Sequence, residues 1–153
     1  MKYSYHYDFP VGRLYIAESD GSLTDVSTKP VEASTEKETP LISQAAGMLR
    51  EYFDGKRKSF DGLPLSFEGT EFQKKAWNAL LAIPYGETRS YKDQAAATGN
   101  IKACRAVGAA NGKNPISIIV PCHRVIGSDN SLVGYGGGLD MKRTLLGLER
   151  KWR

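Results

Sequence analysis

One of the chain's two cysteines, Cys122, lies in the segment IIVPCHRVIG, residues 118–127, directly before His123 and Arg124. Cysteine reacts as the thiolate, so a nucleophilic thiol requires a nearby base or positive charge, and these two neighbours are at hand to supply one. Adjacent residues of an extended segment point to opposite sides, so direct contact between Cys122 and His123 is awkward and a bridging water would have to connect them. The peptide alone also fits an inert buried cysteine beside a structural histidine, which is the commoner fate of a lone thiol.

The remaining cysteine and histidine content argues against other chemistries. Cys104 and Cys122 are too few for a disulfide framework, and the chain has no C-x-x-C pair of the kind that structural zinc sites use. A Cys-His hydrolase would usually recruit a histidine from elsewhere in the chain, and His6 is the only other one. We therefore expect no metal site, and the hydrolase is a weak alternative.

Two short helices are predicted before the cysteine. Residues 92–98 form the first, which ends at Gly99-Asn100, and residues 101–111 form the second, an arrangement compatible with a helix-turn-helix. The second helix, IKACRAVGAAN, consists mostly of residues with small side chains, and Arg105 is the one long side chain near its middle. A reader of the major groove displays several Arg, Asn or Gln side chains, whereas small residues permit the close backbone approach that a narrow minor groove requires. An Ala-rich core helix is the alternative interpretation.

The first part of the chain predicts a separate α+β unit. Residues 1–28 alternate in a strand-like way around turn signals, which is typical of a small antiparallel meander. Residues 40–53 carry an apolar stripe at helical spacing, with Gly55 where a C-terminal cap would lie. The turn formers of DGLPLSFEGT then mark a boundary, so we expect one domain over residues 1–65 and a second over residues 66–153.

The second domain begins with the clearest helix signal in the chain. Thr70 and Gln73 have the spacing of a capping box, and apolar residues recur at helical intervals until Pro84 prevents continuation. Further on, GYGGGLDMKRTLLGLE supplies a loop of consecutive glycines after Tyr135, through which backbone amides can approach a ligand closely.

Charge divides the chain in the same place. Residues 1–70 carry 8 Lys and Arg against 11 Asp and Glu, whereas residues 71–153 carry 13 against 6. A basic second half suggests a polyanionic partner, with nucleic acid favoured over a merely solvated surface. No stretch has the length of an apolar membrane span, and MKYSYHYDFP lacks a signal-peptide core, so we expect a cytoplasmic protein with no membrane contact.

Taken together, four segments resemble the O6-alkylguanine-DNA alkyltransferases, also called methylated-DNA protein-cysteine methyltransferases: FQKKAWNALLAIPYGETRSY, GNIKACRAVGAANGKNP, PCHRVIG and GYGGGLDMKRTLLGLE. The resemblance covers most of residues 72–149. It implies an α+β fold, with a small N-terminal antiparallel sheet plus helix in a ribonuclease-H-like layout. A mostly helical C-terminal domain with a winged helix-turn-helix would follow.

The resemblance also implies roles for individual residues. Cys122 would accept the alkyl group from guanine O6 as a thioether, with His123, Glu149 and a water drawing the proton from the thiol. Tyr91 would donate a hydrogen bond to the departing guanine and help rotate its phosphate. Arg105 would enter the base stack from the minor groove in place of the flipped base.

Two further sets of residues follow from the same resemblance. The predicted DNA contacts are Arg105, Ala103, Ala106, Gly108, Tyr91 and Arg124. The predicted substrate pocket comprises Asn114, which braces the turn before the active-site segment, together with Val125, Ser117, Tyr135, Gly136 and Gly137.

The activity implied is a single-turnover, irreversible transfer from O6-alkylguanine, and also O4-alkylthymine as an open alternative, in double-stranded DNA. No cofactor is required, and the protein would act as a monomer. Ser117 stands where some relatives carry proline and Gly136 where some carry serine, which leaves the range of alkyl groups open. The alternative from another class is a binding-only lesion sensor, but such alkyltransferase-like proteins lack the acceptor cysteine that this chain retains.

Overall fold

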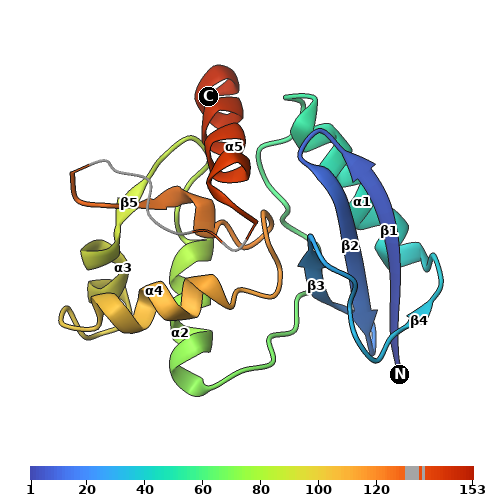
Figure 1. The fold of residues 1–153 in the computed structure, drawn as a ribbon, viewed down its shortest axis with the longest axis horizontal. Coiled ribbons are helices and arrows are strands. Elements are labelled where there is room, and N and C mark those ends of the chain that lie inside the picture. Colours follow the sequence, from blue (N-terminus) through green and yellow to red (C-terminus); the bar gives the residue numbers. More distant parts are fainter. Residues whose placement is uncertain (130–134, 136) are drawn as a thin grey trace. The chain divides into compact units, whose positions relative to one another are not determined.

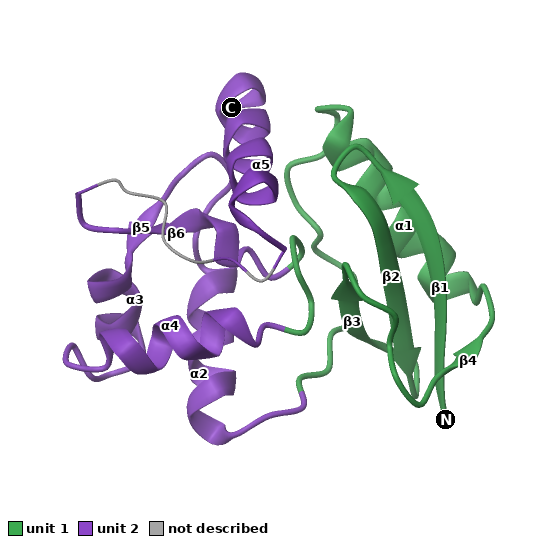
Figure 2. Ribbon diagram, viewed as in Figure 1, with its two compact units in different colours: residues 1–67, 115–119 green, residues 68–114, 120–153 purple. Residues whose placement is uncertain are grey.

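The computed structural model describes residues 1–129, 135 and 137–153, in two compact units (Figure 2). Unit 1 comprises Met1–Phe67 and Pro115–Ile119, and unit 2 comprises Glu68–Asn114 and Val120–Arg153. The sequence placed residues 115–119 in the second domain, whereas they group with unit 1. The physical reason is main-chain pairing: the Val26 N–H donates to the Pro115 carbonyl at 2.9 Å, and the Ser117 N–H donates to the Val26 carbonyl at 3.0 Å.

Unit 1 contains a four-stranded sheet in the order β3-β2-β1-β4 (Figure 1). The predicted meander is present as β1 (Lys2–Phe9), β2 (Gly12–Ser19) and β3 (Ser22–Ser27), which pair antiparallel. The fourth strand, β4 (Thr35–Glu36), runs parallel to β1. The sheet is therefore mixed, not purely antiparallel as predicted, because the chain crosses over after β3 and returns beside β1.

The helix of unit 1, α1 (Pro40–Phe53), has the bounds that the apolar stripe predicted. The Thr39 side chain accepts from the Ile42 N–H at its start, and Gly55 adopts a φ of +74° just beyond its end. Such a left-handed residue is the usual stop signal after a helix. The side chains of α1 that face inward join buried residues of the sheet to form one core, which includes Leu14, Ile16, Leu23, Val26, Ile42, Leu49 and Tyr52.

Unit 2 is mostly helical, with α2 (Glu71–Leu81), α3 (Tyr91–Ala97), α4 (Cys104–Gly112) and α5 (Leu139–Trp152) (Figure 1). A two-residue parallel pair, β5 (Arg89–Ser90) and β6 (Val125–Ile126), completes it. The capping box predicted at Thr70 is confirmed, and a second one at Ser90 and Asp93 begins α3. The expected wing would follow β6 and lies partly outside the described residues.

The second helix of the pair begins three residues later than predicted. Asn100 accepts from the Lys102 N–H through its side chain and from the Ala103 N–H through its carbonyl. This local turn competes with the helix over residues 101–103. α4 therefore starts at Cys104.

The apolar run before the cysteine is buried, but its backbone is not extended along its whole length. Ile116 bridges to Val26, and the chain then turns through Ile118, which has a φ of +71°. After Pro121, residues Cys122–Arg124 form one turn of 3-10 helix. Across the described ranges, no helix is long and apolar enough to cross a membrane.

Candidate active site

Cys122 opens the short 3-10 turn of unit 2 and is 5% exposed, as a free thiol. Its N–H donates to the Val120 carbonyl at 2.8 Å, and the Arg124 N–H donates to the Pro121 carbonyl at 3.0 Å. Successive side chains of a 3-10 turn point about 120° apart, not to opposite sides as in an extended segment. The turn thus sends the side chains of Cys122, His123 and Arg124 in three different directions.

The Asn114 amide contacts the sulfur directly. Its Nδ2 donates to the Val120 carbonyl at 2.8 Å and to Cys122 Sγ at 3.3 Å. The first bond ties Asn114 to the segment just before Cys122, which is compatible with the bracing role that the resemblance implied. The second bond was not predicted, and it favours a negatively charged sulfur because the amide is a donor there.

The environment of Cys122 acts on its pKa in two directions. Burial raises the pKa of the thiol, and this effect is the largest. The hydrogen bond from Asn114, the positive charge of Lys142 and the Tyr135 hydroxyl oppose it. The net direction is upward, so the resting sulfur carries its proton at neutral pH.

His123 is fully buried and pairs with Glu149 of α5, with Nε2 2.6 Å from Oε2. Burial lowers the pKa of the imidazole even though Glu149 acts to raise it, so the ring is neutral at neutral pH. Since a carboxylate only accepts, Nε2 must carry the ring proton and Nδ1 must carry the lone pair. Nδ1 is buried, and no residue that the structure describes hydrogen-bonds to it. It is therefore the atom able to accept a proton.

The Glu149 carboxylate accepts several hydrogen bonds. Besides His123, Oε1 accepts from the Arg124 Nε at 2.8 Å and from the Gly86 N–H at 3.1 Å, and Oε2 accepts from the Arg124 Nη2 at 3.1 Å. Burial alone would raise the pKa of this carboxyl, but the hydrogen bonds and charges of His123 and Arg124 outweigh it and lower the pKa to about 2. Glu149 is therefore ionised at neutral pH.

Arg124 is buried and its guanidinium is already paired, which argues against the DNA contact that the family resemblance implied. The residue is 7% exposed, and its guanidinium is committed to Glu149 and, through Nη1, to the Ile83 carbonyl at 2.7 Å. Its Cζ also lies 5.7 Å from the centre of the Tyr85 ring. The physical reason is that a buried carboxylate requires a buried cation, and Arg124 lies in the same turn as His123.

Tyr91 and Arg105 belong to the two helices of the pair. Tyr91 is the first residue of α3 and is half-buried, and burial followed by the nearby Cys122 raises the pKa of its phenol. The Gly108 backbone of α4 packs beside it, since a Cβ at Gly108 would lie 3.8 Å from the Tyr91 ring. Arg105 and Ala106 are exposed on α4, and Ala103 is partly exposed. α4 therefore presents small residues and one arginine to solvent.

The predicted pocket residues are distributed unevenly. Asn114 and Tyr135 act on the Cys122 sulfur, and Val125 is fully buried in β6. A Cβ at Gly137 would run into the Met141 sulfur and lie close to the Tyr135 ring, so a larger residue there would force these side chains to shift. Ser117 belongs to unit 1 and Gly136 lies outside the described residues, so the substrate contacts assigned to both are still predictions.

Lys142 is a residue that the sequence did not single out. It is 1% exposed, and its Nζ donates to the Val125 carbonyl at 2.7 Å. Burial lowers the pKa of this lysine, while the nearby Cys122 acts to raise it. A signal was present: Lys142, Leu145 and Glu149 recur at helical spacing, which places two charged residues on the buried stripe of α5.

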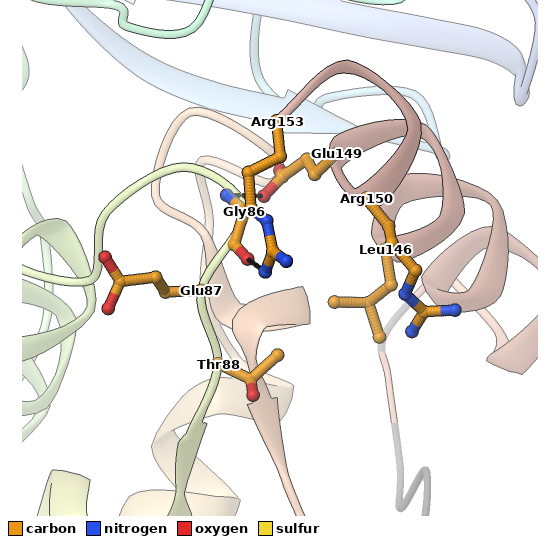
Figure 3. Close-up of a pocket in the computed structure, with 7 residues that line it drawn as sticks. All are labelled: Gly86, Glu87, Thr88, Leu146, Glu149, Arg150 and Arg153. Atoms are coloured by element: carbon orange, nitrogen blue, oxygen red, sulfur yellow. Dashed lines mark hydrogen bonds between the residues drawn. The ribbon is translucent and has the colours of Figure 1, made fainter.

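A small cavity opens beside the Glu149 carboxylate (Figure 3). It has a volume of about 180 Å³ and is lined by Gly86, Glu87, Thr88, Leu146, Glu149, Arg150 and Arg153. The Arg153 side chain covers Gly86, where a Cβ would lie 2.7 Å from its Cδ, and its Nη1 donates to the Gly86 carbonyl at 3.2 Å. Gly86 has a φ of +78°, so glycine allows both this turn and the N–H bond to Glu149.

Comparison with known proteins agrees with this geometry. Residues 71–151 match the family described as 6-O-methylguanine DNA methyltransferase, DNA binding domain, and residues 1–67 match the ribonuclease-like domain of the same family. This chain belongs to the O6-methylguanine DNA methyltransferase family. It is 49% identical to the constitutive methylated-DNA--protein-cysteine methyltransferase of Bacillus subtilis, over 98% of this chain and 96% of that protein. It is 48% identical to the methylated-DNA--protein-cysteine methyltransferase of Methanosarcina barkeri, over 92% of each chain.

Solved structures in the family share the fold. The crystal structure of Mycobacterium tuberculosis O6-methylguanine methyltransferase matches with a TM-score of 0.91 at 45% identity, over 100% of this chain and 95% of that one. The same organism's OGT in complex with DNA matches with a TM-score of 0.91, over 98% of this chain and 94% of that one. The predicted fold class, an N-terminal ribonuclease-like domain followed by a helical DNA-binding domain, is confirmed.

Within the part of the chain that is described, no group of three or more His, Cys, Asp or Glu is placed to hold a metal ion.

Proposed function

We propose that this protein repairs double-stranded DNA by transferring the alkyl group of O6-alkylguanine to the sulfur of Cys122, once per molecule. The observation that carries the assignment is the arrangement of Asn114, Cys122, His123 and Glu149 within unit 2. It combines a buried thiol with a neutral imidazole whose basic nitrogen is available. The family to which the chain belongs supports the same conclusion.

The proton transfer begins from neutral groups. The thiol proton passes through a water to Nδ1 of His123, which gains a positive charge while the sulfur becomes negative. Glu149 stabilises the resulting imidazolium through the bond at Nε2, and the donors that hold its pKa at about 2 keep it a carboxylate throughout. A positioned base of this kind contributes about 10²–10⁴-fold to the rate of a reaction.

The alkyl transfer itself balances without a cofactor. The sulfur forms a bond to the alkyl carbon while the bond from that carbon to O6 breaks, and the electron pair stays on the guanine. Tyr91 would donate a hydrogen bond to the guanine, where negative charge develops in the transition state. The product is a thioether and a normal guanine, and a thioether is not readily reversed, so each molecule reacts once.

The DNA contact would be made by α4. Its exposed small residues allow the backbone to come close to a minor groove, and Arg105 can occupy the space left by an extruded base. An alkylated guanine pairs poorly, which lowers the free energy needed to extrude it and gives one source of selectivity. The proposal includes a monomer that acts in the cytoplasm, and gel filtration of the free protein checks the first of these.

The test is to incubate the protein with a duplex that contains one O6-methylguanine and to map the masses of its peptides. We expect one methyl group on the Cys122 peptide for each lesion lost. Cys104→Ser is the matched control and should still become methylated at Cys122, because Cys104 is the chain's other thiol and is not the proposed acceptor. Lesion loss that persists in Cys122→Ser, or a methyl group on Cys104, would overturn the assignment. Tight lesion binding without any transfer would favour the binding-only alternative.

A further inference from the structure

A reciprocal amide pair links the two helices of the helix-turn-helix. Gln94 of α3 donates through Nε2 to Asn111 Oδ1 at 2.8 Å, and Asn111 of α4 donates through Nδ2 to Gln94 Oε1 at 2.7 Å. The same Gln94 Nε2 also donates to the Ala76 carbonyl of α2 at 3.1 Å. Gln94 is 3% exposed and Asn111 is 9% exposed. One buried pair thus ties three helices together.

The fully buried apolar side chains around this pair are mostly small. α2, α3 and α4 pack against one another in unit 2 (Figure 1). The fully buried cluster between them consists of Ala76, Ala95, Val107 and Ala110, and the partly buried Phe72, Tyr91, Ala103 and Cys104 pack against it. Side chains on a helix surface normally form ridges that fit the grooves of a neighbour and so fix how the helices cross. Alanines form low ridges, so a helix packed mainly on alanines can rotate or slide with little loss of contact. Directional hydrogen bonds must then fix its orientation.

The polar anchors that the described residues give to α4 lie in its C-terminal half. Besides Asn111, the Ala110 carbonyl accepts from Trp77 Nε1 at 2.8 Å. At the other end, the N-cap residue Ala103 has no side chain able to cap, and the helix shows no side-chain cap bond there within the described residues. The orientation of the first turn, which carries Arg105, therefore depends on the anchors further along.

A small rotation of α4 moves the end of the long Arg105 side chain by a large distance. It lies six residues before Asn111, which is about 9 Å along a helix and about 240° around it. An extended arginine carries its guanidinium about 9 Å from the helix axis, so a rotation of α4 by about 20° moves that group by about 3 Å. Misplacement by about 1 Å can slow a reaction about 100-fold where the geometry must be exact.

We propose that the Gln94–Asn111 amide pair is a positioning device that fixes the rotation of α4 on α3 and thereby aims Arg105 into duplex DNA. The inference rests on the proposed function, because it concerns how the flipped base is replaced. The pair does not contact the sulfur, the imidazole or Glu149. Its loss should affect reaction with duplex DNA and spare reaction with a free base.

The test uses the double variant Gln94→Met/Asn111→Leu, which removes both amides together, so that neither is left buried without the other. The rates with an O6-methylguanine duplex and with free O6-benzylguanine are measured for both proteins. We expect the duplex rate to fall about 10-fold or more and the free-base rate to stay within about 2-fold. Ile42→Val in the core of unit 1 is the control for a modest loss of stability, and it should leave the ratio of the two rates unchanged.

A double-mutant cycle with Arg105→Ala separates positioning from a general structural role. In the parent protein this substitution should slow duplex repair strongly. In the Gln94→Met/Asn111→Leu background it should cause little further loss of rate, because the arginine is already out of position. Equal effects of Arg105→Ala in the two backgrounds would overturn the proposal, as would parallel losses with duplex and free base.

If melting shows that the double variant is unfolded, Asn111→Gln tests the same claim, since it keeps the pairing and shifts α4 by one methylene. A duplex-selective loss supports the proposal there, and unchanged or equally reduced rates overturn it.

Failure of the proposed function is distinguishable from failure of this inference. A parent protein that leaves the lesion unconsumed contradicts the function itself. A parent protein that repairs the duplex, with variants that show no selective loss, contradicts only the role of the amide pair.

Discussion

Replacing Arg124 with lysine should weaken reaction with duplex DNA and with a free alkylated base to the same degree. Arg124 gives the Glu149 carboxylate two hydrogen bonds, of 2.8 and 3.1 Å, and gives the Ile83 carbonyl a third, of 2.7 Å. Lysine keeps the positive charge but offers one ammonium in place of a planar fork. It cannot make all three bonds, so Glu149 and with it His123 lose part of their support.

The size of the effect follows from these contacts. A hydrogen bond to a charged group contributes about 1.5–3 kcal/mol, and breaking a buried ion pair outright costs about 3–5 kcal/mol. Because lysine retains the charge, we expect the free energy of unfolding to fall by about 3 kcal/mol. In a chain of this length each kcal/mol lowers the Tm by about 2–4 °C, so the Tm should fall by about 6–12 °C. The rate should fall about 10- to 100-fold, within the range that a positioned general base supplies.

The assay compares the two substrates and their salt dependence at a temperature well below the variant's Tm. The ratio of the duplex rate to the free-base rate should match that of the parent, and the slope of log affinity for DNA against log salt should not change. If Arg124 instead contacted a phosphate, that slope would shrink by about 0.9 and the free-base reaction would be spared. That second pattern would refute the assignment of Arg124 to the Glu149 network.

Three further outcomes follow from the geometry. Arg105→Ala should reduce the rate on duplex DNA far more than the rate with free O6-benzylguanine, and equal losses would contradict a role in base extrusion. Lys142→Met should raise the pKa of the Cys122 thiol because it removes a buried positive charge, and the pH profile of iodoacetamide alkylation measures that shift; an unmoved profile would show that the lysine does not act on the sulfur. Burial lowers the pKa of His123, so the unfolded chain binds its proton more readily and stability should fall as the pH drops below about 6.5. Urea unfolding at several pH values should show this decline in the parent and a flatter profile in His123→Gln, and identical profiles would argue against a neutral buried imidazole.

The elements that the sequence predicted well are those whose signals are local. α1 and α2 have an apolar stripe and a capping residue within their own span, and both lie where they were expected. The start of α4 was misplaced because Asn100, outside the helix, competes for the same backbone groups. The conformation of the apolar run at residues 116–120 could not be predicted, because hydrophobicity reports burial and not conformation. Its shape depends on pairing with β3, which lies about ninety residues earlier in the chain.

The candidate site shows the same limit at the level of side chains. Cys122 and His123 could be proposed from one peptide, but the partner of His123 lies 26 residues away, and only the family resemblance pointed to Glu149. Arg124 shows the same dependence: the resemblance implied a DNA contact for it, whereas the structure pairs its guanidinium with a carboxylate on α5. Lys142 was overlooked because a lysine is expected to be exposed, and burial of its ammonium depends on the Val125 carbonyl.

The buried charges around Cys122 explain how a thiol can be protected at rest and still react. A permanently ionised thiolate would be open to oxidation and to unwanted alkylating agents, and each such event would remove a molecule that can act only once. Burial raises the pKa of Cys122 and lowers that of His123, so both groups are neutral before the lesion arrives. Asn114 and Lys142 on the side of the sulfur, and the Glu149–Arg124 pair on the side of the imidazole, stabilise the charges that appear when the proton moves. The site therefore favours ionisation only as a coupled event, and reactivity depends on an electrophile held in place long enough for that event to occur.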